Sequence, residues 1–141
     1  MKIKSIIALI CTILFVGCCS QCRLRIKNAK PLVGTTWHLV QMEGRDVKLP
    51  QESFNLRFAA DGSLSGKAAC NNLLGRYSTT DKLGLKFLSV GTTMMFCPEN
   101  GELEHQFSQL LSNITHYDID FDTLILIQDG TIKALLRAVE Q

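Results

Sequence analysis

The sequence predicts a mainly β domain with one helix, an α+β fold in which a small antiparallel sheet curls into a barrel-like form. Three observations predict it. Apolar residues recur with a period of two through most of the chain after residue 32. Turn residues separate these segments at intervals of about ten residues, as in antiparallel barrels and sandwiches. One segment, between residues 98 and 113, has a helical period instead.

Five short strands are expected before the helix. The segment 54–58 alternates strictly, so that Phe54, Leu56 and Phe58 share one face. The dipeptide Asp61-Gly62 predicts a hairpin turn, because Asp tolerates and Gly favours positive φ. The expected strands are residues 37–40, 54–58, 63–68, 83–88 and 92–96.

The helix between residues 98 and 113 is expected from five apolar residues that share one helical face: Leu103, Phe107, Leu110, Leu111 and Ile114. Three closing strands should follow it, with a second hairpin at Asp129-Gly130. The apolar run 124–127 is typical of a strand covered on both faces. These closing strands are residues 115–119, 123–128 and 131–139.

Length and charge limit the classes of function. A chain of 141 residues, 46% apolar and 20% charged, is long enough for one domain with a substantial core. Its 15 basic and 13 acidic residues give a net charge of +2. A dedicated nucleic-acid-binding domain would be markedly basic on one face, so we expect no nucleic-acid partner. We expect the protein to be a monomer.

The first 17 residues have the pattern of an export signal. Lys2 and Lys4 precede an apolar run over residues 6–16, and Gly17 stands before Cys18. As a helix this run would be about 16 Å long, against roughly 30 Å for a hydrocarbon core. It is therefore too short for a permanent membrane span.

The end of this signal, residues 15–18, resembles the lipobox of bacterial lipoproteins, in which the cysteine is acylated and becomes the mature N-terminus. The resemblance implies lipidation of Cys18 and a membrane anchor. Cys19 is not the Asp that resembles an inner-membrane retention signal, so we expect an outer-membrane lipoprotein that faces the periplasm or the cell surface. An ordinary signal peptide cut nearby is the alternative. Residues 18–31 would form a basic tether, and residues 32–141 the folded domain.

Four motifs occur along the domain in a fixed order. They are Gly34-x-x-Trp37, Gly66-x-x-x-Cys70-Asn71-x-x-x-Gly75-x-Tyr77, Thr93-x-Met95-x-Cys97 and Glu104-x-x-Phe107. Together they resemble the META domain family over residues 32–139. The resemblance implies a small, mostly β, barrel-like domain with one helix, often lipidated, and it implies no established catalytic activity. The chain departs from the pattern at Ala69, where Gly is common, and at Phe96, where a small residue is common.

Cys70 and Cys97 are the two cysteines of the domain. In an exported protein we expect them to be oxidised together, which would contribute about 3.5 kcal/mol by restricting the unfolded chain. Free buried thiols, or a reactive thiol such as Cys97 beside His105, are the alternatives. Cys19 and Cys22 form a C-x-x-C sequence without the context of a redox, zinc or haem site, so a tether disulfide or incidental cysteines are expected there.

Asn71 and Asn72 are interpreted as part of a shaped connection between strands, because Asn accepts left-handed conformations and caps its own turn. The alternative is a binding role: with Arg76 and Tyr77 they would form a loop that recognises a partner. Tyr77, like Trp37, is expected in the core or at its rim, because large rings fill cores.

The sequence contains none of the motifs that signal common enzyme chemistry, namely a phosphate loop, a nucleophile elbow or a metalloprotease helix. We expect no cofactor, no metal and no catalytic residue. The prediction is a non-enzymatic, lipid-anchored envelope protein that acts in stress tolerance through contacts with a protein of unknown identity or with a surface. Two alternatives remain: a barrel that holds a small apolar ligand, and a thiol enzyme that uses Cys97 or Cys70.

Overall fold

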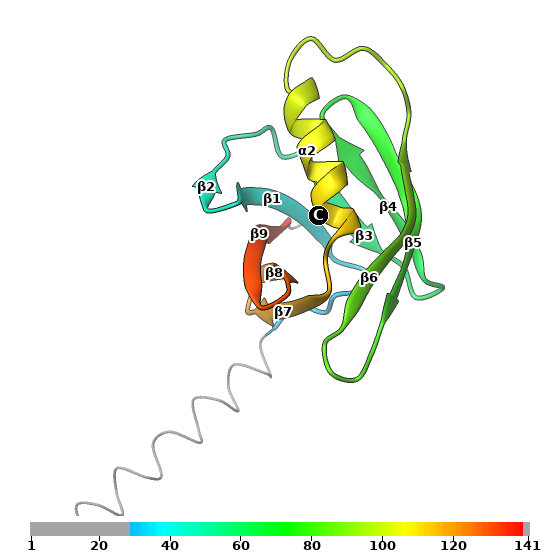
Figure 1. Cartoon of the computed structure of the whole chain (residues 1–141), viewed down its shortest axis with the longest axis vertical. Coiled ribbons are helices and arrows are strands. Elements are labelled where there is room, and N and C mark those ends of the chain that lie inside the picture. The colour runs from blue at the N-terminus through cyan, green and yellow to red at the C-terminus, as the bar shows by residue number, and fades with distance from the viewer. Residues whose placement is uncertain (1–28, 140–141) are drawn as a thin grey trace, which may run out of the picture.

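The computed structural model describes residues 29–139. One antiparallel sheet curls into a half-barrel around the helix α2 (Gly101–Ser112), which confirms the predicted fold class (Figure 1). The strands follow the order β6-β5-β4-β3-β1-β9-β8-β7, and β2 pairs with β1. They are β1 (Thr36–Met42), β2 (Arg45–Asp46), β3 (Asn55–Phe58), β4 (Ser63–Ala68), β5 (Asn71–Thr79), β6 (Leu85–Thr92), β7 (His116–Asp120), β8 (Thr123–Gln128) and β9 (Thr131–Val139).

The two edge strands, β6 and β7, meet at one end of the half-barrel. There the backbone N–H of Leu85 donates to Thr115 O, and that of Tyr117 donates to Leu83 O, both at 3.0 Å. An isolated antiparallel bridge joins Gly84 to His116 between these two bonds. We call residues 83–85 and 115–117 the closed end. Farther along, α2 lies between the diverging halves of the sheet and packs on β6 and β4 (Figure 1).

Local turn signals position two of the hairpins correctly. Gly62 and Gly130 have φ values of 80° each, as the Asp-Gly hairpin predictions require. In the first hairpin, Asp61 Oδ1 accepts hydrogen bonds from the backbone N–H and the hydroxyl of Ser63. The predicted ranges of β4, β8 and β9 are confirmed residue for residue.

The core fills the inside of the half-barrel. Phe54, Leu56 and Phe58 are fully buried, as their alternation predicts. Trp37 is also fully buried, and its indole N–H donates to Leu32 O at 3.1 Å. Each such side chain contributes about 1.5 to 3 kcal/mol through its burial. The helix, β1, β5, β6 and β8 complete this core with Phe107, Leu111, Leu39, Leu73, Leu85, Leu124 and Leu126.

Two predictions in the middle of the chain are wrong: the connection at residues 71–75 and the strand at residues 92–96. The segment expected to be a shaped connection is the nine-residue strand β5, which pairs with β4 and with β6. Gly75 lies within this strand, at a register shift between β5 and β6. A Cβ there would lie 3.1 Å from the Cα of Val90, so the position favours glycine. The strand expected at 83–88 is present as β6, which continues to Thr92, whereas the strand expected at 92–96 is absent because residues 93–97 lie outside any strand.

The expectation that β8 is covered on both faces is also wrong. Leu124 and Leu126 are buried, whereas Ile125 and Ile127, on the outward face, are only half-buried. The reason is topological: α2 lies on the concave side of the sheet, so within residues 29–139 no second layer covers the convex side of β8 (Figure 1).

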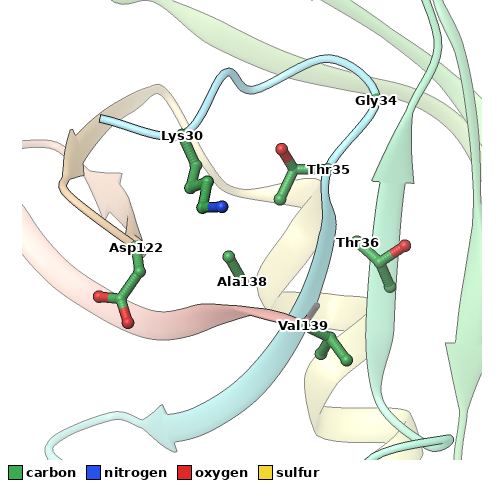
Figure 2. A pocket seen from close by; sticks show the side chains of 7 residues that line it. All are labelled: Lys30, Gly34, Thr35, Thr36, Asp122, Ala138 and Val139. Atoms are coloured by element: carbon green, nitrogen blue, oxygen red, sulfur yellow. The ribbon is translucent and has the colours of Figure 1, made fainter. Parts of the chain in front are cut away.

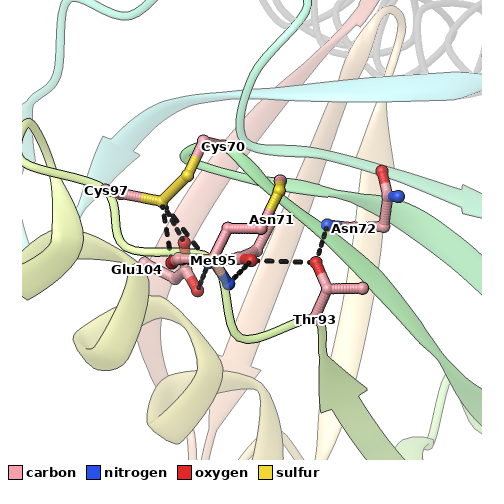
Figure 3. Close-up of a disulfide and its surroundings, with 7 residues drawn as sticks. All are labelled: Cys70, Asn71, Asn72, Thr93, Met95, Cys97 and Glu104. Atoms are coloured by element: carbon pink, nitrogen blue, oxygen red, sulfur yellow. Dashed lines mark hydrogen bonds between the residues drawn. A yellow bond between two sulfur atoms is a disulfide. The ribbon is translucent and has the colours of Figure 1, made fainter.

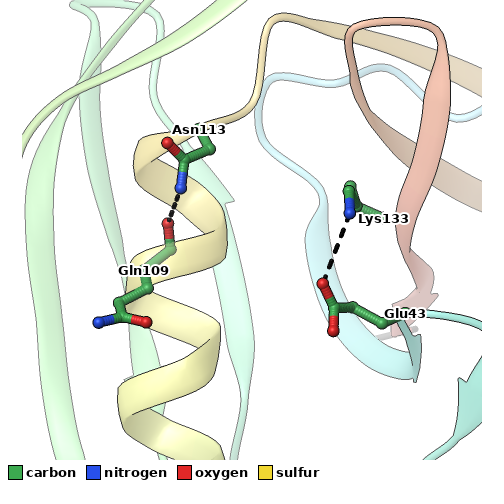
Figure 4. A network of polar contacts seen from close by, with 4 residues as sticks. All are labelled: Glu43, Gln109, Asn113 and Lys133. Carbon is green, nitrogen blue, oxygen red and sulfur yellow. Dashed lines mark hydrogen bonds and ion pairs between the residues drawn. The ribbon is translucent and has the colours of Figure 1, made fainter.

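The two ends of α2 differ in their capping. Asn100, with φ 64°, precedes α2 and makes no side-chain cap. At the other end, the Asn113 side chain donates to Gln109 O at 3.0 Å, and its backbone N–H bonds Leu110 O (Figure 4). Nearby, an ion pair of 3.5 Å between Lys133 of β9 and Glu43 lies between two neighbouring segments of the sheet (Figure 4).

Residues 29–139 contain no helix that is long and apolar enough to cross a membrane. The predicted signal segment, the lipidation of Cys18 and the cysteines of the tether, Cys19 and Cys22, all lie outside the described residues.

Candidate interaction site

A disulfide between Cys70 and Cys97 joins two segments that are distant in the sequence. Cys70 lies in the short turn between β4 and β5, and Cys97 lies in the segment that leads from β6 to α2. Their Cα atoms are 6.0 Å apart, within the ordinary range for disulfides. The oxidised pair leaves neither sulfur free to act as a nucleophile, and His105 faces no thiol at Cys97.

Asn71 stands at the centre of a polar network beside this disulfide (Figure 3). Its side chain is 3% exposed. Its Oδ1 accepts from the Thr93 hydroxyl and from the Met95 N–H, both at 2.8 Å. Its Nδ2 donates to Met95 O at 3.1 Å and to Glu104 Oε1 at 2.8 Å. These four bonds use the whole capacity of the carboxamide and tie β5 to the segment 93–97 and to α2.

Asn72, the next residue, has a different role. Its side chain is exposed and points away from the disulfide (Figure 3). Only its backbone takes part: its N–H donates to Thr93 Oγ1, and its carbonyl accepts from the Thr93 N–H, both at 3.0 Å. The segment 93–97 is therefore fixed at Thr93, at Met95 and at Cys97.

The side chains carried by this fixed segment are apolar and exposed. Met94 is 99% exposed, Met95 55% and Phe96 90%. We call residues 94–96 the apolar tip. Large apolar side chains that gather on a surface commonly mark a binding site, because leaving them in water has a free-energy cost that a partner removes.

A shallow depression of about 320 Å³ adjoins the apolar tip. Phe96 and the disulfide form one side of it. The other lining residues are Pro50, Ser53, Ala69, Pro98, Glu99 and Asn100. The surface next to the tip is therefore largely apolar, with one carboxylate at its margin.

The residues predicted to form a partner-binding loop do not form one. Asn71, Asn72, Arg76 and Tyr77 all belong to β5. Arg76 donates to Asp61 O at 3.3 Å, and the Tyr77 hydroxyl donates to Ala59 O at 2.7 Å, so both side chains serve the β3–β4 hairpin. The loop prediction is wrong because Asn and Gly, which favour turns, are held in this strand by their pairing with β4.

Tyr77 lies at the rim of the core, as expected for a large ring. It packs edge-on against Phe58, with ring centroids 4.9 Å apart. Partial burial raises the pKa of its phenol, and the nearby Asp61 carboxylate adds to the shift. Its hydrogen bond and ring contact give it a structural role.

The three histidines lie on three different elements and make no hydrogen bond to Asn71 or to the disulfide within residues 29–139. His38 is buried in β1 and bonds Ser53 O through Nδ1 at 2.9 Å, whereas His105 and His116 are exposed. Within residues 29–139 no group of three or more His, Cys, Asp or Glu residues could hold a metal ion.

The largest side chains of the core occupy the interior in which a barrel would hold a ligand. A second hollow, of about 560 Å³, lies at the surface where the described chain begins (Figure 2). Its lining includes Lys30, Thr35, Thr36 and Asp122. This hollow is polar and open to solvent, so it does not have the character of a pocket for an apolar ligand.

Comparison with a family model identifies the domain. The model of the META domain matches residues 30–140. The chain belongs to the META domain family. Part of the motifs that suggested this family forms the disulfide network: the Cys70-Asn71 pair, the Thr93, Met95 and Cys97 segment, and Glu104 of α2. The large rings of the other motifs lie in the core or at its rim.

Solved structures share the fold of this META domain. A protein from Burkholderia xenovorans, solved by NMR, is 23% identical, with a TM-score of 0.62 over 78% of this chain and 85% of the other. A DUF4847 family protein from Bacteroides vulgatus, solved by crystallography, is 19% identical, with a TM-score of 0.57 over 78% and 94%. No curated protein matches the chain. At these identities the likeness concerns the fold alone.

The two departures from the family pattern have structural meanings. Ala69 has φ 46°, a left-handed conformation that costs any residue with a Cβ, which explains why Gly is common at this position. Phe96 adds a large exposed ring to the apolar tip where a small residue is common. The departure at Phe96 was the one sequence signal that could have pointed to the tip.

Proposed function

We propose that this META-domain protein is a lipid-anchored, non-enzymatic component of the bacterial cell envelope that acts by binding a partner through the apolar tip. The observation that carries the proposal is the exposure of Met94 and Phe96 on a backbone that Asn71 and the disulfide hold in place. A fixed apolar surface loses little conformational entropy on binding, which favours contact with a partner.

The place where Lys30 joins the domain is compatible with a lipid anchor on the preceding segment. Lys30 N–H donates to Phe121 O at 2.7 Å, in the turn between β7 and β8. Figure 1 shows this turn and the segment that leads into α2 at opposite ends of the molecule. A lipid on Cys18 would therefore attach to the domain at the end away from the apolar tip, and the tip would face away from the membrane.

The sequence supports the anchor itself. A basic start, a short apolar run and Gly17-Cys18 form a lipoprotein signal, and two or three acyl chains hold a protein on a membrane stably. Because Cys19 differs from the Asp of inner-membrane retention signals, we assign the outer membrane as the destination. Stress tolerance is the physiological role that the family resemblance suggests.

Substitution of Cys18 tests the anchor. In cells that lack the gene, wild-type protein should fractionate with the outer membrane and restore tolerance to envelope stress. Cys18→Ser should appear in the soluble fraction and fail to restore it, whereas Cys22→Ser, the matched control, should behave as wild type. Full rescue by soluble Cys18→Ser would contradict the need for an anchor.

A double substitution in the tip tests the contact surface. Met94→Ser combined with Phe96→Ser removes exposed apolar area, so folding stability should change by less than about 0.5 kcal/mol. The variant should remain in the membrane but lose rescue. Ile132→Ser, which removes an exposed apolar side chain from β9, is the control. Rescue by the tip variant equal to that by wild type would refute the role of the tip.

A further inference from the structure

We infer that the partner of the apolar tip is a protein whose binding groove is apolar at its floor and carries Lys or Arg at its rim. This inference rests on the proposed function, because it names the chemistry of what the tip binds. The tip supplies the apolar part through Met94 and Phe96, and the shallow depression beside Phe96 extends it.

Two exposed carboxylates, Glu99 and Glu102, follow the apolar tip in the sequence. Glu99 is exposed and lines the depression, and Glu102 is exposed in the first turn of α2. Within residues 29–139 neither forms an ion pair: Glu102 accepts only from the neutral Gln106 side chain, at 2.9 Å. Glu104 likewise bonds the neutral Asn71. An apolar surface with a carboxylate rim is complementary to an apolar groove with a cationic rim.

The same charges disfavour two other occupants. A bacterial membrane surface carries anionic lipids, which repel carboxylates and attract Lys and Arg instead. Two copies of this chain that paired through the tip would place Glu99 and Glu102 of one copy near those of the other, because a symmetric interface uses the same patch twice. A different protein with a cationic rim avoids both repulsions.

Photocrosslinking in living cells tests the inference. The full-length chain carries p-benzoylphenylalanine at position 96, or at position 132 as a control on an exposed part of β9. We expect position 96 to form a covalent adduct with one other protein and position 132 to form none. The crosslinked peptide of that protein should lie beside Lys or Arg residues.

Charge reversal makes the test specific. Glu99→Lys combined with Glu102→Lys should lower the yield of the adduct about tenfold, because like charges then face each other across the interface. Glu99→Gln with Glu102→Gln should lower it less. Reversing the partner's flanking Lys or Arg to Glu should restore the yield with the lysine variant. Retention of the Cys70–Cys97 disulfide, measured by mass spectrometry, controls for folding.

Each of the other outcomes of the crosslinking test would contradict one specific part of the proposal. A protein adduct whose yield does not respond to charge reversal would refute the cationic rim and leave the tip as a contact surface. An adduct between two copies, or with a lipid, would refute the protein groove. No adduct at position 96 would refute the proposed function itself, since the tip would then contact nothing.

Discussion

The two ends of this half-barrel are held together in different ways. At the closed end, residues 83–85 and 115–117 are joined by backbone hydrogen bonds, which nearly any side chain permits. At the end that carries the apolar tip, one backbone bond joins Thr93 to Asn72, and the rest of the segment 93–97 is held by one carboxamide, one hydroxyl and one disulfide. A segment held by a few side chains can be loosened without unfolding the sheet. Substitutions around residues 93–97 should therefore affect the apolar tip while the rest of the sheet stays folded.

The largest expected effect comes from removing the disulfide. Cys70→Ala with Cys97→Ala should lower the free energy of unfolding by about 3.5 kcal/mol, because the unfolded chain regains the freedom of the loop. Amide exchange should accelerate in residues 93–97 and much less at the closed end. Equal acceleration at both ends would contradict the difference between them. Chemical denaturation and residue-level hydrogen exchange measure the two quantities.

The next effect concerns Asn71. Asn71→Ala should lower the free energy of unfolding by roughly 2 to 3 kcal/mol, since Thr93, Met95 and Glu104 lose their partner at a mostly buried position. Asn72→Ala is the matched control, because that side chain is exposed, and should change it by less than about 0.5 kcal/mol. Similar losses for the two variants, in urea denaturation, would show that the network does not hold the segment.

A gain of stability is expected at Ala69. Its φ of 46° is unfavourable for a residue with a Cβ, so Ala69→Gly should raise the free energy of unfolding by about 1 kcal/mol. The neighbouring Ala68 is buried in β4, and Ala68→Gly should lower it. Thermal denaturation of both variants measures the difference. A loss at position 69 would mean that the turn before Cys70 is not left-handed.

The smallest expected effect on stability comes from Asp61. The backbone of its hairpin is also fixed by a hydrogen bond from Tyr77 N–H to Gly62 O. Hydrogen bonds from the Ser63 hydroxyl and N–H lower the pKa of Asp61 below its ordinary value of 3.8. A lowered folded pKa means that these bonds stabilise the protein above the unfolded pKa and that the contribution is lost as pH falls through the folded pKa.

An NMR titration of the Asp61 carboxyl in wild type and in Ser63→Ala checks this shift. The substitution removes the hydrogen bond from the Ser63 hydroxyl, which lowers the pKa most, so the pKa of Asp61 should rise toward 3.8. An unchanged pKa would mean that the Ser63 hydroxyl does not bond the carboxylate in solution.

The parts of the fold that could be predicted are those with local signals. The Asp61-Gly62 and Asp129-Gly130 turns define their hairpins because two residues suffice to specify the turn. The strand β5 is not predicted because Asn71, Asn72 and Gly75 favour turns by themselves, and only their pairing with β4 makes them part of a strand. Secondary structure that depends on partners distant in the sequence has no local signal.

The candidate site, too, could be predicted from the sequence only in part. The pairing of Cys70 with Cys97 could be expected because the domain has two cysteines and the sequence before it has the pattern of an export signal. The role of Asn71 could not, because its partners Thr93, Met95 and Glu104 are 22, 24 and 33 positions away. The exposure of Phe96 has no local signal either, because residues 92–96 are predicted to be a strand; only the departure from the family pattern distinguishes Phe96.

NMR relaxation of the oxidised protein tests most directly the claim that the apolar tip is held ready for binding. If Asn71 and the disulfide fix the segment, the backbone order parameters of Met94, Met95 and Phe96 should be about 0.85, as in the sheet, and the Met95 amide should be protected from exchange. Order parameters below about 0.6, with an unprotected Met95 amide, would contradict the account.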